Sequence, residues 1–316
     1  MTRPRWKPIL GAVVVIVAGA YLAQMIASAP PVKVSVSLGR TLGFGALGLA
    51  LALGHYAMWA YAWQHILRAL GVEVAMRDAL RTICLANLGK YAPGSIWSLL
   101  GRLYIGQHLG ATIPAMVTAL ILENLIVAYC SALLGAAYLP LLLPQSPALG
   151  WLVFAGLVVG GIATLAWPRL ILYPAHLLAR LLRQPMIERV PPRRTLLTYG
   201  LLLFVAVTIF SIGGFCLAAA IMDVPLRAMP PFVAAYNASW IIGYMVPFAP
   251  AGLGVREGAF ATLLTPLLTA GGAVAVSILT RVAIAIVESA IGVAALLTWP
   301  NWRDALRDVR EHPPTR

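Results

Sequence analysis

The feature that most constrains this chain is a series of long apolar stretches. At about 20 residues each, six of them are long enough to cross roughly 30 Å of hydrocarbon as helices. They run near residues 9–28, 41–66, 112–137, 148–167, 196–222 and 273–299. Only 10% of the 316 residues are charged, whereas ordinary globular domains carry about a quarter. The sequence therefore predicts an all-α polytopic membrane protein with six spans.

The net charge of +13 follows the expected membrane topology. If the N-terminus is cytoplasmic, most of the 23 Lys and Arg residues fall in cytoplasmic stretches, as the positive-inside rule requires. The exceptions are Lys33, Arg40, Arg227, Arg256 and Arg281. We therefore expect a protein of the bacterial cytoplasmic (inner) membrane with both termini cytoplasmic. An anionic leaflet, and not nucleic acid, is the expected partner of the basic stretches.

Two regions between the spans are too apolar for ordinary loops and too interrupted for ordinary helices. Residues 79–107 form two arms of about 13 residues around Ala92-Pro93-Gly94, and residues 231–268 form two arms around a second break rich in Pro and Gly. An arm of about 13 residues reaches only about 20 Å, which is too short to span alone. Both regions are predicted to be re-entrant hairpins, buried by neighbouring helices or lining a wet cavity. The alternative is up to ten short helices.

The two halves of the chain resemble each other weakly. Each hairpin carries a Tyr, a break and an Arg, and a long helix with a central Glu follows. With the N-terminus inside, the hairpins enter from opposite faces, so an inverted internal repeat is predicted. Such repeats point to a transporter whose site lies at their interface. Within one transmembrane domain, 1–316, the units are 76–140 and 229–299, joined by a basic cytoplasmic connector at 168–195.

Two glutamates near span centres need a reason, because a charge there costs on the order of 2.5 to 3.5 kcal/mol. They are Glu123 and Glu288, and Arg281 lies two turns before Glu288 on the same helix face. We expect Arg281 to pair with Glu288. A purely structural ion pair, or a carboxyl that stays protonated, is the alternative to a functional role.

Cations beside the hairpin breaks predict a phosphate site. Lys90, Arg102 and Arg256 supply charge, the glycines allow close backbone approach, and helix N-termini add N–H groups. Snorkelling to the membrane surface is the alternative for the cations, and Glu257 is a candidate to hold Arg256. The predicted substrate-binding residues are Lys90, Tyr91, Gly94, Arg102, Glu123, Tyr244, Gly252, Gly254, Arg256, Glu257, Arg281 and Glu288.

No motif predicts a metal, cofactor or nucleotide site. Cys84, Cys130 and Cys216 lack CxxC spacing, and the five histidines form no HExxH-like cluster. The run GLGVREG has no strand before it and is not a dinucleotide motif. We therefore expect no cofactor and no catalytic residues.

The motifs GKYAPGSIW with Arg102, and APAGLGVREGAF followed by a glutamate-bearing span, resemble the membrane domain of lysylphosphatidylglycerol synthases, a flippase-like family of integral membrane proteins. The resemblance covers about residues 8–300. In bifunctional members a soluble aminoacyl transfer domain makes the modified lipid and the membrane part moves it. This chain is expected to lack that synthase chemistry, because it extends only 17 residues past the last span.

The resemblance implies lipid translocation or a closely related lipid-handling role. We expect a flippase that moves an anionic phospholipid or another lipid-linked phosphate. One alternative is a partner subunit of an enzyme that makes lipids or lipid-linked sugars. Another is a lipid-modifying membrane enzyme that uses Glu123 or Glu288 as a base.

Overall fold

A computed structural model describes residues 37–89, 97–142, 145–167, 173, 191–246, 252 and 254–298. These residues form helices joined by short connections, and no strand occurs among them. The predicted all-α fold is therefore confirmed. The predicted span at 9–28, most of the connector at 168–195, and Lys90, Tyr91 and Gly94 lie outside the described residues.

Five of the described helices are long and apolar enough to cross a membrane, and they coincide with five of the predicted spans. They are α2 (Leu38–Ala69), α5 (Ile113–Ala136), α7 (Pro147–Ala166), α9 (Arg193–Ile221) and α12 (Ala270–Leu297). Hydroxyl caps mark three of their starts: Ser37, Thr112 and Thr269 each accept a hydrogen bond from a first-turn backbone N–H.

Shorter helices occupy the two interrupted regions. They are α3 (Met76–Leu88) and α4 (Trp97–His108) in the first, and α10 (Met229–Tyr244) and α11 (Val255–Leu264) in the second. The longest, α10, has 16 residues and so measures about 24 Å at 1.5 Å per residue. Each arm is thus shorter than the roughly 30 Å of hydrocarbon, as predicted. The turns α6 (Leu139–Leu142) and η2 (Leu226–Ala228) are connectors.

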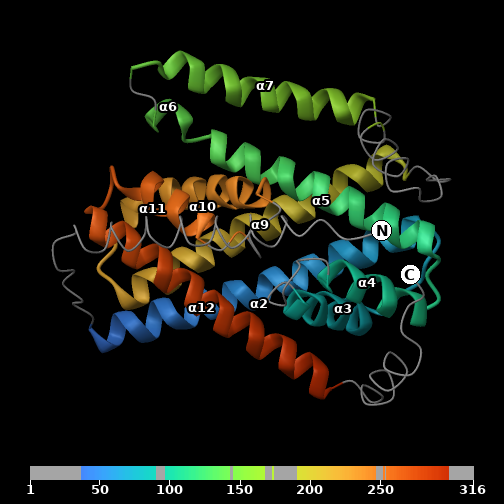
Figure 1. Cartoon of the computed structure of the whole chain (residues 1–316). Helices are drawn as coiled ribbons and strands as arrows, with labels where there is room; N and C mark the ends of the chain where they lie inside the picture. The colour runs from blue at the N-terminus through green and yellow to red at the C-terminus, as the bar shows by residue number, and fades with distance from the viewer. Residues whose placement is uncertain are drawn as a thin grey trace, which may run out of the picture.

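The centre of the bundle is a long contact between α2 and α9 (Figure 1). Gly48 and Gly213 let the two backbones approach closely. A Cβ added to Gly48 would lie 3.1 Å from the carbonyl oxygen of Gly213 and 2.9 Å from the Leu217 side chain. Small residues at such crossings maximise van der Waals contact between membrane helices.

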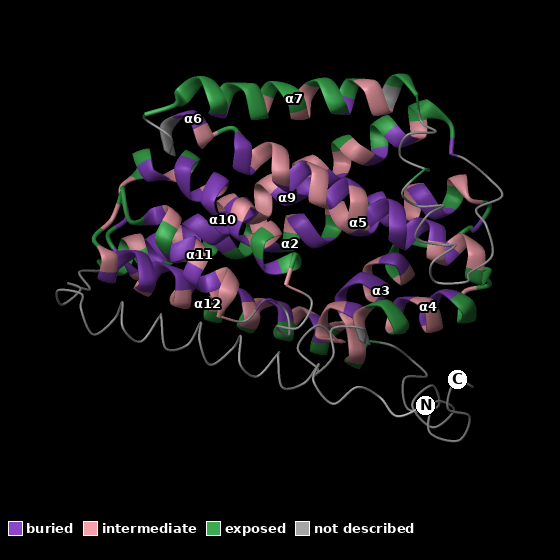
Figure 2. Cartoon of the chain, turned by 45° about the horizontal axis from the view of Figure 1, so that its top comes forward, coloured by how far each residue is buried: buried purple, intermediate pink, exposed green. Residues whose placement is uncertain are grey.

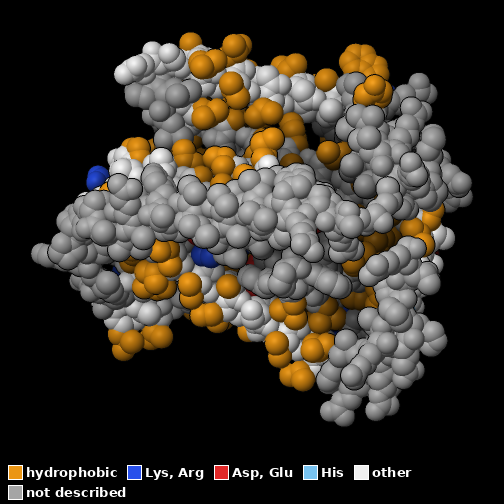
Figure 3. All heavy atoms as spheres, in the orientation of Figure 1, with side chains coloured by type: hydrophobic (Ala, Val, Ile, Leu, Met, Phe, Trp, Pro, Cys, Tyr) orange, Lys and Arg blue, Asp and Glu red, His pale blue; other side chains and the backbone are white. Residues whose placement is uncertain are grey.

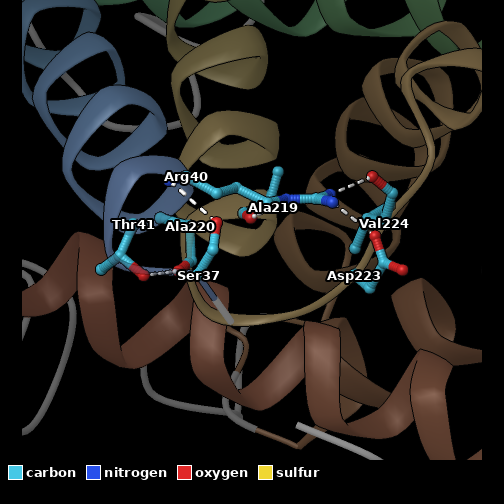
Figure 4. A network of polar contacts seen from close by, with 7 residues as sticks. All are labelled: Ser37, Arg40, Thr41, Ala219, Ala220, Asp223 and Val224. Atoms are coloured by element: carbon cyan, nitrogen blue, oxygen red, sulfur yellow. Dashed lines mark hydrogen bonds and ion pairs between the residues drawn. The ribbon is translucent and has the colours of Figure 1, made fainter. Parts of the chain in front are cut away.

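Arg40 fixes the relative direction of α2 and α9 (Figure 4). From the first turn of α2, its Nε donates to the carbonyl of Ala219 at 3.1 Å and its Nη2 to that of Val224 at 2.8 Å, and Nη1 pairs with Asp223. Thr41 donates to the carbonyl of Ala220 at 3.0 Å. Because the start of α2 meets the end of α9, the helices are antiparallel, and the arginine satisfies carbonyls that a helix end leaves unpaired.

The two pairs of short helices, α3 with α4 and α10 with α11, lie toward opposite ends of this bundle. In Figures 1 and 2, α3 and α4 gather toward one end and α11 toward the other. The packing is reciprocal, since α3 contacts α12 and α10 contacts α5. Burial is concentrated in the central helices, whereas α7 is mostly exposed at the outside (Figure 2). The side chains of described residues seen in Figure 3 are mostly hydrophobic, as a lipid-facing surface requires.

Candidate functional site

A cavity of about 270 Å³ with charged residues in its lining lies where the two halves meet. Its lining comes from α2, α3, α4 and α5 of the first half and from α9, α10, α11 and α12 of the second. The charged residues that line it are Arg102, Glu123, Arg256, Arg281 and Glu288. All five are predicted site residues, and Tyr244 also lines the cavity.

Arg102 and Glu123 form an ion pair between α4 and α5. Both residues are buried, at 7% and 4% exposure, and the Arg102 guanidinium lies 5.0 Å from the centroid of the Trp63 ring. The pair therefore ties the first hairpin to the long helix that follows it. It also means that each of these charges is compensated by the other.

Glu257 holds Arg281 and the start of α11. Its Oε2 accepts the backbone N–H of Gly254 at 2.7 Å, and its Oε1 lies 3.3 Å from Nε of Arg281. Ser277 donates to the backbone carbonyl of Glu257 at 2.9 Å, which adds a second link to α12. Glu257 was a candidate to hold Arg256, but its Oε2 is used in the helix cap and its Oε1 faces Arg281. Arg281 forms an ion pair with Glu257, whereas the sequence predicted Glu288 as its partner.

Glu288 takes part in a chain of hydrogen bonds across three helices. Tyr56 of α2 donates to Glu288 Oε1 of α12 at 2.9 Å, and Asn87 of α3 donates to the Tyr56 hydroxyl at 3.2 Å. Glu288 is 4% exposed. Tyr56 and Asn87 were not among the predicted site residues. The available signal was a pair of polar residues, His55 and Tyr56, inside the apolar run 41–66.

Arg256 extends from the second residue of α11 toward α10 and the cavity. Its guanidinium carbon lies 4.6 Å from the centroid of the Tyr236 ring, a cation–π contact. It lines both the main cavity and an adjoining pocket of about 10 Å³. Among the described residues no carboxylate forms an ion pair with it. Arg256 is thus a cavity cation that no described carboxylate holds in an ion pair.

The glycines of the second break shape the backbone and do not line the cavity. Gly252 and Gly254 have φ values of +68° and +82°, which favour glycine. A Cβ on Gly252 would lie 3.1 Å from the Cα of Gly243 in α10. The Gly254 N–H is already used by Glu257. The N–H of Gly254 is therefore occupied within the protein.

Replacing Gly252 by alanine is expected to destabilise the second hairpin by about 1–2 kcal/mol, the usual cost of a left-handed L-residue. The contact with the Gly243 backbone adds to this cost. The thermal unfolding midpoint of purified protein in detergent measures the effect. Gly156→Ala is the matched control, since a Cβ at that position in α7 meets nothing within 4 Å. An equal or higher midpoint for Gly252→Ala would contradict the explanation.

The described part of the chain groups no three His, Cys, Asp or Glu side chains in a way that could hold a metal ion. The three cysteines are buried and free. The polar side chains that line the site are arginines, carboxylates, amides, hydroxyls and one imidazole. Such groups suit recognition of an ionic, hydrogen-bonding ligand.

Two comparisons with known proteins bear on this site. Residues 6–292 match the family model described as the lysylphosphatidylglycerol synthase TM region. No curated protein matches the chain.

Proposed function

Since the chain belongs to the lysylphosphatidylglycerol synthase transmembrane family, whose membrane domain implies a role in lipid handling, we propose that it is a lipid flippase. Its cargo is an anionic phospholipid or another lipid-linked phosphate, moved across the bacterial cytoplasmic membrane. Both termini are cytoplasmic in this proposal. The observation that carries it is Arg256, a cavity cation with no described carboxylate partner.

The charge pattern of the cavity favours an anion beside Arg256. Arg102 is neutralised by Glu123, and Arg281 lies against Glu257. A cation inside a membrane protein costs on the order of 2.5 to 3.5 kcal/mol on insertion scales. A phosphate supplies the missing counter-ion, and an arginine fork binds it through two parallel hydrogen bonds.

The size of the cavity restricts what enters it. Ligand pockets for drug-sized molecules usually measure about 300–1,000 Å³, and this cavity measures about 270 Å³. That space suits a headgroup, while the acyl chains stay in the bilayer. The neutral polar lining, which includes Asn87, Asn124 and Asn237, offers hydrogen bonds to the rest of the headgroup.

The arrangement of the two halves supports alternating access. The units 76–140 and 229–299 form an inverted repeat in this proposal, with the cavity at their interface near the membrane midplane. Support comes from the reciprocal packing of α3 on α12 and α10 on α5, and from the hairpins at opposite ends of the bundle. Movement of one unit against the other opens the cavity to one leaflet at a time.

Glu123 and Glu288 balance the cavity cations when no lipid is bound, and one of them takes up a proton during the cycle. The sequence has no nucleotide motif, so downhill exchange or proton linkage drives the movement. In this proposal the protein is not an enzyme.

Reconstitution tests the proposed function. Purified protein is placed in phosphatidylcholine vesicles that contain a trace of fluorescent phosphatidylglycerol. We expect the protein to move labelled lipid from the inner leaflet to the outer leaflet, where added dithionite bleaches it. Protein-free vesicles provide the baseline, and mass spectrometry of the recovered lipid is expected to show it chemically unchanged. A modified lipid would instead support the enzyme alternative. Absence of transfer for every anionic lipid tested would favour the partner subunit.

A further inference from the structure

A second cavity lies on the outer side of the bundle, between α5, α7 and α9. It measures about 460 Å³, which is larger than the charged cavity. Its described lining is apolar apart from three groups, and each of these already has a partner in the protein. Tyr129 donates to the Leu157 carbonyl at 2.7 Å, Thr164 to that of Gly161 at 2.8 Å, and Cys130 to that of Gly200 at 3.9 Å.

The position of α7 places this cavity at hydrocarbon depth. Trp151 and Trp167, near the two ends of α7, are 59% and 66% exposed. They are 16 residues apart, about 24 Å along a helix, and exposed indoles of membrane helices sit at the two interfaces. Val158 and Ile162, which line the cavity from α7, therefore lie between the two headgroup layers.

The outer cavity is separate from the charged one. They share no described lining residue and use opposite faces of α5. Glu123 and Val127 face the charged cavity, whereas Ile126, Tyr129 and Leu133 face the outer one. A lipid whose headgroup is beside Arg256 therefore has α5 between its headgroup and the outer cavity.

We infer that the outer cavity binds an acyl chain of a membrane phospholipid that stays with the protein and is not its cargo. Water gains little there, because the lining hydroxyls already donate within the protein and the rest of the described lining is apolar, and apolar cavities stay dry and accept apolar ligands. Left empty, this space would forfeit dispersion contacts along its lining. The exposed side chains of Ile162, Leu197 and Leu201 at its edge adjoin the bilayer, where acyl chains are the surrounding solvent. The headgroup of this lipid remains at the membrane surface.

Tyr129 keeps the cavity open by spacing α7 from α5. Its hydroxyl bonds to α7 at Leu157, and a Cβ on Gly161 would lie 2.0 Å from the same oxygen. The tyrosine therefore fits only against a glycine, which holds α7 at a fixed distance. This inference does not depend on the proposed transport function.

Photo-crosslinking tests the acyl-chain site. The whole protein is placed in nanodiscs with phosphatidylcholine that carries a diazirine at mid-chain, and labelled peptides are mapped by mass spectrometry. We expect enriched labelling of the cavity lining on α5 and α9 over other lipid-facing surfaces. Gly200→Leu is expected to lower the labelling of the cavity lining about tenfold. Its side chain displaces two buried methylene groups of the acyl chain, which lowers the binding constant by about that factor.

Gly200 is suitable because a Cβ there approaches nothing closer than Ile126 Cγ2 at 4.0 Å, so a leucine grows into the cavity. Gly156→Leu is the matched control, since Gly156 has open space and does not line the cavity. Ile162→Trp, at an exposed rim position, blocks the same space without depending on the fold of α9. Labelling that is unchanged in both blocking variants, or evenly spread over all lipid-facing helices, would overturn the inference.

Discussion

Arg256→Ala is expected to lower the protein-dependent transfer of anionic lipid by roughly 10- to 150-fold, because a hydrogen bond to a charged group contributes about 1.5–3 kcal/mol. The structural reason is that Arg256 lines the cavity without a described carboxylate partner. Arg256→Lys keeps the charge and loses the two-pronged geometry, so an intermediate rate is expected. The vesicle assay with fluorescent phosphatidylglycerol measures all three proteins.

Arg227→Ala is the control for Arg256. It removes the same charge from an exposed position that does not line the cavity, so the transfer rate should stay at the wild-type value. A wild-type transfer rate for Arg256→Ala, in protein that inserts normally, would count against phosphate binding at Arg256. A loss of the same size in Arg256→Ala and Arg227→Ala would instead point to a general charge effect.

The second large effect concerns stability and the ion pair of Arg102 with Glu123. Arg102→Leu leaves a buried carboxylate without its counter-charge, which typically costs about 3–5 kcal/mol. The double variant Arg102→Leu with Glu123→Leu removes both charges, and we expect it to recover most of the loss. Equilibrium unfolding in detergent, monitored by helical circular dichroism, measures the free energies of unfolding.

The exposed pair of Arg40 with Asp223 is a matched control for this experiment. The Asp223 side chain is 68% exposed, and exposed pairs contribute about 0–1 kcal/mol. Asp223→Ala should therefore change the free energy of unfolding far less than Arg102→Leu. If the two single variants cost the same, or if the double variant is as unstable as Arg102→Leu, the buried pair does not have the predicted role.

Hydropathy predicted most of the fold, because the cost of exposing polar backbone to hydrocarbon leaves few ways to arrange long apolar runs. The five described spans end within a few residues of the predicted limits. The hairpin arms were predicted from the breaks at Pro93-Gly94 and at 247–254, since both residue types interrupt helices. The gathering of Arg102, Glu123, Arg256, Arg281 and Glu288 in one cavity followed from their occurrence inside or beside apolar segments.

Pairings within the site were harder to predict. Helix periodicity places Arg281 and Glu288 on one face, but it carries no information about Glu257, which approaches Arg281 from another helix. Glu257 follows Arg256 in sequence, yet the capping bond to Gly254 turns its carboxylate away. Tyr236 gave no signal of its own, because aromatic residues are common throughout apolar helices. Side-chain direction therefore had to come from the structure.

The tight crossing at Gly48 and Gly213 has a mechanical consequence. A slide of α2 along α9 would carry bulkier side chains into a gap that admits only hydrogen atoms, so the crossing resists shear. The two helices are therefore expected to keep their relative position and to act as one rigid unit in the bundle. Any movement of the short helices α3, α4, α10 and α11 is therefore expected to leave the crossing of α2 and α9 unchanged.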